Sequence, residues 1–375
     1  MTNLAVSNGD ERPPKTNQPL SSSPMSSPSS FTSLPRDMVL NVIARVPKRL
    51  YPILCCVSKN LRSLVRSPEI QETRSLIGKD SLYICVEDIT RDEEYVITRT
   101  YHWFNLRRVE KSTTENVFVS VDFSFLSESC HVSSSIFAVG PEMFFILNDG
   151  SPSFRIFDTQ SGKVRQGPSL LVNRTYNCVG IVGGKIYVIG GYKEDELTAE
   201  SFDLKTEAWE TAPSPHNKER LIWIHGTGAS LDRKVCAVSF FRCLTCYDPR
   251  DGSCETSQMS FSDWWNTGVC VIDNVLYVYF FSYGLMWYDT ELKLWRLVYG
   301  LDLGEAQGVA MAEYYGKLAF LWEKPSLVSS ESKEIWCRMI GLAWSEAEIN
   351  GTAEPSQLLR IVPRTFDFHH CLSVG

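Results

Sequence analysis

The segment ESFDLKTEAW, residues 200–209, decides the fold, because copies of it recur along the chain. Each copy places an aromatic residue directly before an Asp, and an apolar residue or Cys six positions after that Asp. The Asp residues are Asp158, Asp203, Asp248 and Asp289, separated by 45, 45 and 41 residues, so the repeat has a period of about 44 residues. The other copies are FRIFDTQSGKV at 154–164, TCYDPRDGSC at 245–254 and MWYDTELKLW at 286–295.

Another short apolar strand, introduced by a polar turn, precedes each copy, as in KIYVIGG from Lys185. Strands this short cannot bury their apolar faces alone, whereas four-stranded sheets arranged radially around an axis bury them and leave few exposed edges. The repeat therefore predicts a mainly β chain that forms a β-propeller over residues 80–375. Weaker strand pairs near both ends bring the expected number of blades to six, at about 80–130, 131–175, 176–222, 223–262, 263–303 and 304–375.

Three kinds of residue in the repeat have a physical reason to stand where they do. Each Asp can open a turn, because its carboxylate accepts hydrogen bonds from backbone N–H groups two residues later. Gly190 and Gly191 end a strand where the backbone must turn with positive φ or approach another segment closely. Trp209 and Trp295 supply large apolar surfaces for packing between neighbouring blades. We expect all of these residues to be structural.

Helical spacing replaces the strand pattern over residues 31–77. The first of three short helices is predicted by apolar residues that recur at three- and four-residue intervals, namely Val39, Val42, Ile43 and Val46. A second helix is expected from about residue 50 to 56, and Ser58 can cap a third. A module this small has too little interior to hide all of its apolar side chains, so we expect a neighbour, or another protein, to cover some of them.

The first 30 residues are rich in Ser, Pro and Asn and nearly lack large apolar side chains, which predicts a disordered leader over 1–30. They contain no apolar run typical of a signal peptide, and the chain has no stretch of about 18 uncharged apolar residues. We therefore expect a cytoplasmic or nuclear protein that does not enter a membrane. In these reducing compartments the 12 cysteines are expected to be buried small hydrophobes rather than disulfides.

The formal net charge of -7 argues against broad nucleic-acid binding, which usually requires a basic excess on the binding domain. The charge is unevenly distributed along the chain. Residues 1–80 hold 11 Lys and Arg against 6 Asp and Glu, a net charge of +5, which leaves -12 for the remaining residues. A basic N-terminal part suits an acidic protein partner.

The repeat resembles the kelch motif, which combines an aromatic residue before Asp with a Trp six residues after it. Only the copy with Gly190 and Gly191 has the double glycine of that family. The helical module resembles the F-box, since SLPRDMVLNVIARVPKRLYPILCCVSKNLRSLVRSPE, residues 33–69, follows the F-box pattern almost throughout. The combination is similar to a large plant family of F-box/kelch-repeat proteins. It implies a kelch-type propeller preceded by a small three-helix F-box module.

The resemblance implies the function of a substrate-recognition subunit of an SCF-type E3 ubiquitin ligase, which is not itself a catalyst. The F-box of such a subunit docks on a Skp-type adaptor, which links it to a cullin and a RING subunit, while the propeller binds the protein to be ubiquitinated. The receptor acts by position, because it raises the effective concentration of a target lysine near the conjugating enzyme. The residues expected to contact the adaptor, or to support those that do, are Leu34, Pro35, Leu40, Ile43, Val46, Pro47, Leu54 and Val57.

Target contacts are expected on one rim of the propeller, where the loops between strands vary in length. The candidate loops are 193–196, 214–224, 262–266 and 326–333. Aromatic and Arg side chains are frequent anchors of protein interfaces. The candidate anchors are Arg220, Trp223, Trp264 and Trp265, although Trp in such repeats more often lies in the core.

Motifs for catalysis or metal binding are missing or weak. The phosphate-loop GxxxxGK[ST], the GxSxG of α/β-hydrolases and the HExxH of metalloproteases do not occur. Cys243 and Cys246 form a CxxC without a second ligand pair, so we expect core cysteines there. His369, His370 and Cys371 are of metal-ligand type, but neighbours on a strand point to opposite faces, so a plain terminal strand is expected. We expect no metal and no cofactor.

Two other functions fit the same sequence. A kelch-type propeller can act as a scaffold or interaction protein that is independent of ubiquitin, in which case a Skp-type adaptor would not co-purify with it. It can also sense a metabolite within the propeller channel. A ligand bound there would raise the thermal stability of the protein.

Overall fold

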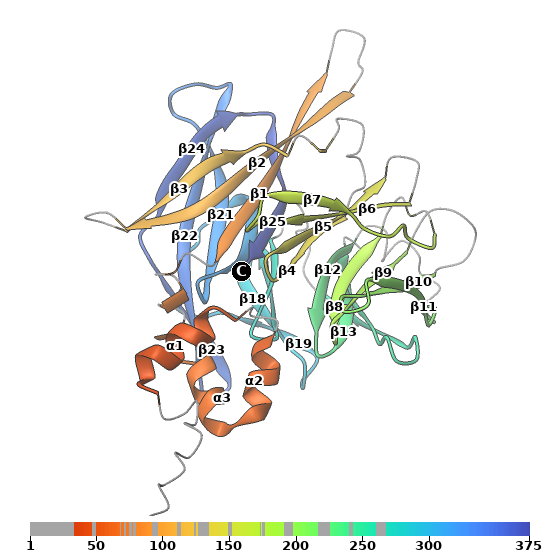
Figure 1. Ribbon diagram of the computed structural model, residues 1–375. Helices are drawn as coiled ribbons and strands as arrows, with labels where there is room; N and C mark the ends of the chain where they lie inside the picture. The colour runs from red at the N-terminus through yellow and green to blue at the C-terminus, as the bar shows by residue number, and fades with distance from the viewer. Residues whose placement is uncertain are drawn as a thin grey trace, which may run out of the picture. The chain divides into compact units, whose positions relative to one another are not determined.

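A computed structural model describes most of the chain from Leu34 to the C-terminus, as the ribbon diagram in Figure 1 shows. The chain divides into two compact units, residues 1–39 and 40–375. The predicted leader lies outside the described residues. The described ranges are 34–46, 50–67, 69–70, 73–74, 77, 80–91, 97–110, 114–123, 125–126, 135–148, 152–172, 174, 177–190, 198–216, 226–239, 243–259 and 268–375.

Three short helices form where the apolar spacing predicts them: α1 (Arg36–Ala44), α2 (Tyr51–Val57) and α3 (Lys59–Val65). Ser58 caps α3 as predicted, since the Leu61 backbone N–H donates to its Oγ at 3.1 Å. The buried stripe of α1 differs from the prediction, because Val42 is 48% exposed. Residues on one side of a 3.6-residue helix lie at 39, 40, 43 and 44, and residue 42 lies off that side. The buried residues are Val39, Leu40, Ile43 and Ala44.

The strands of the described chain form six antiparallel sheets, which are the six blades of a β-propeller, as predicted (Figure 1). The strands of each blade are named from the innermost to the outermost. The first three blades are β25 (Phe366–Val374), β1 (Ser81–Arg91), β2 (Ile97–Glu110) and β3 (Thr114–Val121); β4 (Ser135–Val139), β5 (Glu142–Asn148), β6 (Pro152–Asp158) and β7 (Lys163–Gln166); and β8 (Cys178–Val182), β9 (Lys185–Ile189), β10 (Ala199–Asp203) and β11 (Ala208–Ala212).

The last three blades follow in sequence order. The sixth blade carries an additional strand, because the long β22 pairs with β23 through its second half and with β24 through its first half. These blades are β12 (Gly226–Leu231), β13 (Lys234–Ser239), β14 (Cys243–Tyr247) and β15 (Cys254–Gln258); β16 (Val269–Ile272), β17 (Val275–Phe280), β18 (Gly284–Asp289) and β19 (Leu294–Leu297); and β20 (Gln307–Tyr314), β21 (Lys317–Pro325), β22 (Ser332–Ser345), β23 (Glu348–Ala353) and β24 (Gln357–Pro363).

The ring of blades is closed by the C-terminal strand. The innermost strands β25, β4, β8, β12, β16 and β20 each contact the next one around the ring. Strand β25, dark blue in Figure 1, belongs to the first blade, where it pairs with β1 from Ser81–Val374 to Asp88–Phe366. The prediction that residues 304–375 form one blade is therefore wrong at its end. Exchanging a strand between the two ends of the chain leaves no unpaired edge at the closure point.

Each of the six interfaces between neighbouring blades holds its own cluster of buried apolar side chains. Between the second and third blades, for example, Phe154 packs edge-on against Phe202 and Trp209, with ring centroids 5.0 and 5.2 Å away. Within its own blade Trp295 packs edge-on against Phe280 and at a tilt against Tyr288, and it also packs against the cluster between the fourth and fifth blades. Both tryptophans of the repeat thus supply the apolar packing surface predicted for them.

The repeat Asp residues open turns in the way the sequence predicts. Asp158 and Asp248 accept hydrogen bonds from the backbone N–H two residues later at 2.9 and 3.0 Å. Asp203 and Asp289 do the same at 2.8 and 3.1 Å. The hydrogen bond and charge of the Arg250 side chain lower the pKa of Asp248 to about 2. Each carboxylate therefore stabilises the turn between the third and fourth strands of its blade.

Of the two glycines, the structure describes only Gly190. Gly190 has φ +103°, so the left-handed backbone that only glycine adopts easily is present there, as predicted. Gly191 lies outside the described residues. The carbonyl of Gly190 accepts a hydrogen bond from Arg174, whose buried guanidinium also pairs with Glu200 at 2.6 Å. This ion pair fixes the backbone on either side of the connection between β9 and β10.

One pair of cysteines departs from the expectation of free core thiols. Cys236 and Cys246 face each other across β13 and β14 and form a disulfide. Directly opposite residues of an antiparallel pair bring their Cβ atoms within reach of such a bond. Cys243, the other member of the CxxC, is 2% exposed in the apolar core between the third and fourth blades, as expected. Cys85, Cys178, Cys270 and Cys337 are buried free thiols, as expected, whereas Cys56 on α2 is exposed.

We predict that Val374→Asp weakens the closed ring strongly. Val374 is 2% exposed and packs beside Tyr83 and Cys85 of the first blade. A carboxylate at this place would lie in an apolar interface without a partner, so we expect the free energy of unfolding to fall by about 3 kcal/mol or more. Urea unfolding followed by tryptophan fluorescence measures it. The control Ile361→Asp, on a 46% exposed side chain of β24, should change it by less than about 1 kcal/mol; equal effects would contradict closure by β25.

We predict that Asp248→Ala lowers stability in a pH-dependent way. At pH 7 the loss of the turn hydrogen bond should lower the free energy of unfolding by about 1 to 2 kcal/mol. Because folding lowers the pKa of Asp248, its contribution is fully present above about pH 4 and is lost as the pH falls through about 2. The gap between wild type and variant should therefore close over that window in urea titrations. Asp248→Asn keeps an acceptor oxygen and should lose less; a gap that stays constant down to pH 2 would exclude the carboxylate as its source.

Candidate functional site

The two ends of the propeller differ in their connections. At the tight-turn end, two-residue turns such as 183–184, 232–233 and 273–274 join the innermost strand of a blade to the next strand. At the opposite, long-loop end lie the connections between blades and the connections between second and third strands. The described strands that flank the four predicted target loops end and begin at the long-loop end.

The chain enters and leaves the propeller at the tight-turn end. The carbonyl of Asp80, directly before β1, accepts a hydrogen bond of 2.9 Å from the Tyr315 hydroxyl in the turn between β20 and β21. The backbone N–H of Gly375 donates to the carbonyl of Gly140, in the turn between β4 and β5, at 3.0 Å. The long loops therefore open at the end of the blades opposite to the one where the helical segment is joined.

Arg74 connects the helical segment to the start of the propeller. Its side chain is 1% exposed and forms an ion pair with Asp80, with 2.5 Å between Nη2 and Oδ1. Its Nη1 donates to the carbonyls of Ala44 and Val46, at 2.9 and 3.0 Å, just where α1 ends. A buried guanidinium with this many fixed acceptors holds the end of α1 and the residue before β1 in one arrangement.

Apolar side chains are exposed on α1. Met38 is 54% exposed and Val42 48% exposed, and residues four apart lie on one face of a helix. Leu34, ahead of the helix, is 41% exposed. These positions lie off the stripe that the helix buries, so they are available to a partner.

A second set of exposed apolar side chains follows α2. Leu50, Ile53 and Val57 are 39, 62 and 66% exposed and recur at intervals of three and four residues, so they share one face. Tyr51, on the other side of α2, is buried and donates to the carbonyl of Ile43 at 3.2 Å. Exposed large aliphatic residues in a row on a short helix are typical of an interaction surface. We call Leu50, Ile53 and Val57 the α2 face.

The residues predicted to serve the adaptor separate into two groups by burial. Leu34, Pro35 and Val57 are exposed, and Val46 and Leu54 are half-buried. Leu40 and Ile43 are only 7 and 2% exposed, so they support the module from within and cannot touch a partner directly. Pro47 lies outside the described residues. Sequence reasoning missed Met38, Leu50 and Ile53, whose spacing opposite to the buried stripe is the signal that could have found them.

The surroundings of the α2 face are basic. Residues 40–67 contain six Lys and Arg and not a single Asp or Glu. Lys59 and Arg62 of α3 and Arg66, which caps its C-terminal end, are exposed. An apolar face with a basic surround fits an acidic partner that also offers apolar residues.

The predicted target anchors are not placed by the structure. Arg220, Trp223, Trp264 and Trp265 lie outside the described residues, as do the loops 193–196 and 262–266 and most of 214–224. The loop 326–333 is described, and two aliphatic residues at its tip, Leu327 and Val328, are 100 and 82% exposed. Apolar side chains held in water at a loop tip can contribute to a protein interface.

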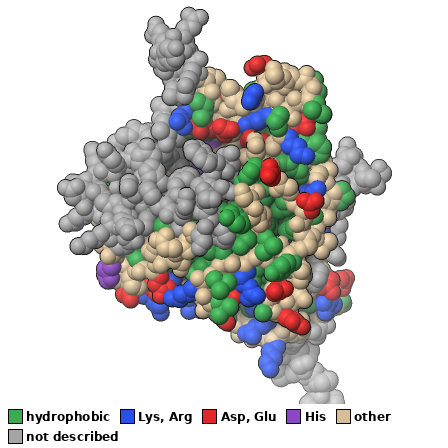
Figure 2. Space-filling model, turned by 180° about the vertical axis from the view of Figure 1, so that it is seen from behind, with side chains coloured by type: hydrophobic (Ala, Val, Ile, Leu, Met, Phe, Trp, Pro, Cys, Tyr) green, Lys and Arg blue, Asp and Glu red, His purple; other side chains and the backbone are tan. Residues whose placement is uncertain are grey.

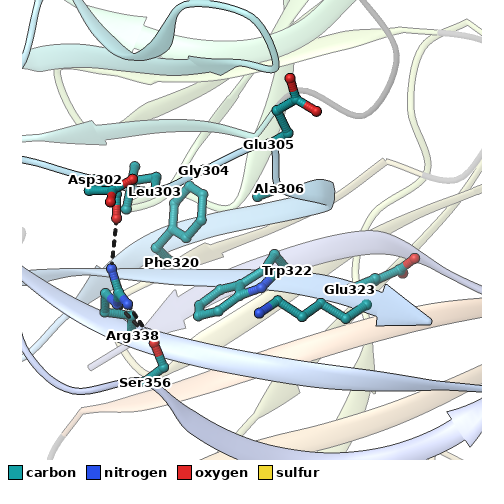
Figure 3. Close-up of a pocket in the computed structure, with 11 residues that line it drawn as sticks. Asp302, Leu303, Gly304, Glu305, Ala306, Phe320, Trp322, Glu323, Arg338 and Ser356 are labelled. Atoms are coloured by element: carbon teal, nitrogen blue, oxygen red, sulfur yellow. Dashed lines mark hydrogen bonds between the residues drawn. The ribbon is translucent and has the colours of Figure 1, made fainter. Parts of the chain in front are cut away.

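A cavity of about 340 Å³ opens beside this loop (Figure 3). It is lined by the connection between β19 and β20, by β21, and by single residues of β22 and of the link between β23 and β24. The N-terminal end of β20 and the C-terminal end of β21 are paired here, at Gln307 and Glu323. The cavity therefore lies at the long-loop end of the sixth blade.

Within the described residues, no three His, Cys, Asp or Glu side chains come together as a metal site. His369, His370 and Cys371 lie on the terminal strand β25, as predicted. The two histidines do not point to opposite faces as predicted, because a bulge in the pairing of β25 with Cys85 and Val86 brings their rings to 4.3 Å between centroids. Among the described helices none is long and apolar enough to cross a membrane.

Charges of both signs alternate over the described surface in Figure 2, with hydrophobic side chains between them. On the face shown there, no broad field of basic side chains appears on the described residues. Interspersed charges of both signs are ordinary for the surface of a folded protein.

Comparison with known proteins gives two family matches. Residues 31–73 match the model of the F-box domain, and residues 103–359 match the model described as FKB95, Kelch-repeats domain. The chain is 58% identical to the F-box/kelch-repeat protein At2g44700 of Arabidopsis thaliana, over 99% of this chain and 100% of the relative. It is 57% identical to the F-box/kelch-repeat protein At2g44630 of the same plant, again over 99% of this chain and 100% of the relative.

We predict that Arg74→Met destabilises the protein by about 3 to 5 kcal/mol, because the variant leaves the Asp80 carboxylate buried without its cation. Chemical unfolding monitored by far-UV circular dichroism measures the loss. The additional change Asp80→Leu should restore part of the lost stability, since it removes the stranded charge.

A matched control is Arg66→Met at the C-terminal end of α3, where the Arg66 side chain is exposed. Its effect should stay within about 0.5 kcal/mol. If the Arg74 and Arg66 variants unfold at the same urea concentration, the buried ion pair does not hold the two segments together.

Proposed function

Because the chain belongs to the F-box/kelch-repeat family, we propose that it is the substrate-recognition subunit of an SCF-type E3 ubiquitin ligase. The F-box docks on a Skp-type adaptor and, through it, on a cullin and a RING subunit. The propeller binds the protein that is to be ubiquitinated. The subunit acts in the cytoplasm or the nucleus and supplies no catalytic group of its own.

The observation that carries this proposal is the α2 face. Ile53 and Val57 are each more than 60% exposed, because the small interior of the module cannot cover all of its apolar side chains. Covering two such side chains by a partner contributes about 1.5 to 3 kcal/mol each when burial is complete. The six Lys and Arg within residues 40–67 add attraction to an acidic adaptor and speed its association.

The arrangement of the propeller supports the same function. The helical segment is joined at the tight-turn end, through Arg74, Asp80 and Tyr315. The loops that vary in length lie at the opposite end of the blades. A target held there is carried by the same rigid body of six blades, so its lysines are confined near the conjugating enzyme and their effective concentration rises.

We predict that Ile53→Asp weakens binding of a purified plant Skp-type adaptor at least tenfold. The substitution removes an apolar contact and places an unpaired charge in the interface, and each tenfold loss corresponds to about 1.4 kcal/mol. Ile53 is better suited to this test than Ile43, because Ile43 is 2% exposed and its substitution would disturb folding. Isothermal calorimetry on the full chain measures the dissociation constant.

The matched control is Val328→Asp, which places the same charge on an 82% exposed residue at the long-loop end. It should bind the adaptor as the wild type does, and both variants should keep the circular dichroism spectrum of the wild type. Wild-type protein that does not bind the adaptor at all would favour a scaffold independent of ubiquitin. Equal affinity of the wild type and the Ile53 variant would exclude the α2 face as the docking surface.

A further inference from the structure

The cavity at the long-loop end of the sixth blade has an aromatic floor. Trp322 of β21 is 7% exposed and Phe320 of the same strand 1% exposed. The ring of Trp322 stacks against Trp336 of β22, with centroids 6.3 Å apart and planes 22° apart. In Figure 3 the Trp322 ring lies below the segment from Asp302 to Ala306, and Arg338 lies to its left. Such a floor can pack against the aliphatic part of a bound side chain.

Two cations face this floor. The Lys324 ammonium lies 5.8 Å from the Trp322 ring and 5.4 Å from the Trp336 ring, and the Arg338 guanidinium lies 5.9 Å from Trp322. Among the described residues neither cation has an acidic partner within ion-pair distance. Their positive charges are therefore balanced by π-faces and water, and not by a carboxylate.

Neutral acceptors hold the Arg338 side chain in place. Its Nη1 donates to the carbonyl of Asp302 at 2.9 Å, and its Nε and Nη2 donate to the Ser356 hydroxyl at 3.0 and 2.7 Å (Figure 3). A guanidinium has five N–H donors, and these three bonds leave one on each terminal nitrogen. Arg338 is thus oriented before a ligand arrives, and the two remaining donors can bind one carboxylate.

Three acidic residues line the cavity, and none of them forms an ion pair with these cations; Asp302 binds Arg338 through its backbone carbonyl. Glu323 is bound by Lys333 at 2.7 Å, and burial raises the pKa of Glu323 to about 7 despite that cation. The Glu305 side chain points away from the Trp322 floor in Figure 3, and so does that of Glu323. The Glu305 carboxylate at the margin repels a doubly charged phosphate more than a singly charged carboxylate.

We propose that this cavity binds an Asp or Glu side chain of a peptide segment of the target protein. The carboxylate is held by Arg338 and Lys324, and its aliphatic stem packs on Trp322. A peptide is favoured over a small free acid because β21 runs from the cavity directly into the loop with Leu327 and Val328 exposed. Those residues would contact apolar neighbours of the acidic residue. The inference rests on the proposed function, since it names the chemistry of the target that the receptor takes.

Oriented peptide libraries test the proposal on the full chain. Four libraries carry degenerate flanks around one fixed residue, which is Glu, Gln, phosphoserine or Lys. We expect the Glu library to be retained most, and Arg338→Gln to reduce its retention at least tenfold. The control Arg233→Gln makes the same change on an exposed Arg at the tight-turn end and should leave retention unchanged.

Several outcomes would overturn the proposal. Equal retention of the Glu and Gln libraries would show that no carboxylate is recognised. Stronger retention of phosphoserine or Lys would assign the cavity to a different ligand, and unchanged binding by the Arg338 variant would place recognition elsewhere. Adaptor binding is measured on the same samples. Loss of Glu selectivity with intact adaptor binding rejects the cavity alone, whereas Glu selectivity without adaptor binding rejects the ligase role alone.

Discussion

No blade of this protein can bury both of its faces by itself, and the whole structure follows from that constraint. A four-stranded sheet has two apolar faces, and each of the six interfaces between blades holds a separate cluster of buried side chains. Every blade thus depends on both neighbours, so the ring must close. Closure is made by hydrogen bonds between β25 and β1, which join the two ends of the propeller chain. The rigid ring then presents tight turns at one end and long connections at the other.

Much of the fold can be predicted from the sequence, because the sequence repeat has a physical cause. The aromatic–Asp pair fixes a turn through a backbone N–H, and the residue six positions later, as at Trp209, packs against the preceding blade. This pattern recurs in four blades at intervals of 41 to 45 residues, and weaker strand pairs near both ends of the chain indicate the other two. The closing strand could not be predicted, because the pairing of β25 with β1 depends on how the first and last strands of the propeller meet in space. The bulge at His369 and the disulfide between Cys236 and Cys246 depend on strand register in the same way.

The functional surface was less predictable than the fold. The F-box pattern names buried residues such as Ile43 as well as exposed residues such as Val57, and only the structure separates the two groups. The cavity of the sixth blade was not predicted, because the residues that line it come from four segments between Asp302 and Ser356. Arg338 and Trp322 belong to ordinary strand patterns until the structure brings them together. The cavity lies at the long-loop end of the blades, opposite to the end where Arg74 and Asp80 join the helical segment to β1.

If adaptor and target bind at opposite ends of this chain, a purified Skp-type adaptor should change hydrogen–deuterium exchange of the full protein at one end only. We expect slower exchange in peptides that cover α1 to α3, above all residues 50–57. Exchange should stay unchanged at 302–306 and 320–324, where the cavity of the sixth blade lies. Protection at the cavity, or none across the helices, would show that the adaptor does not bind the helical end alone.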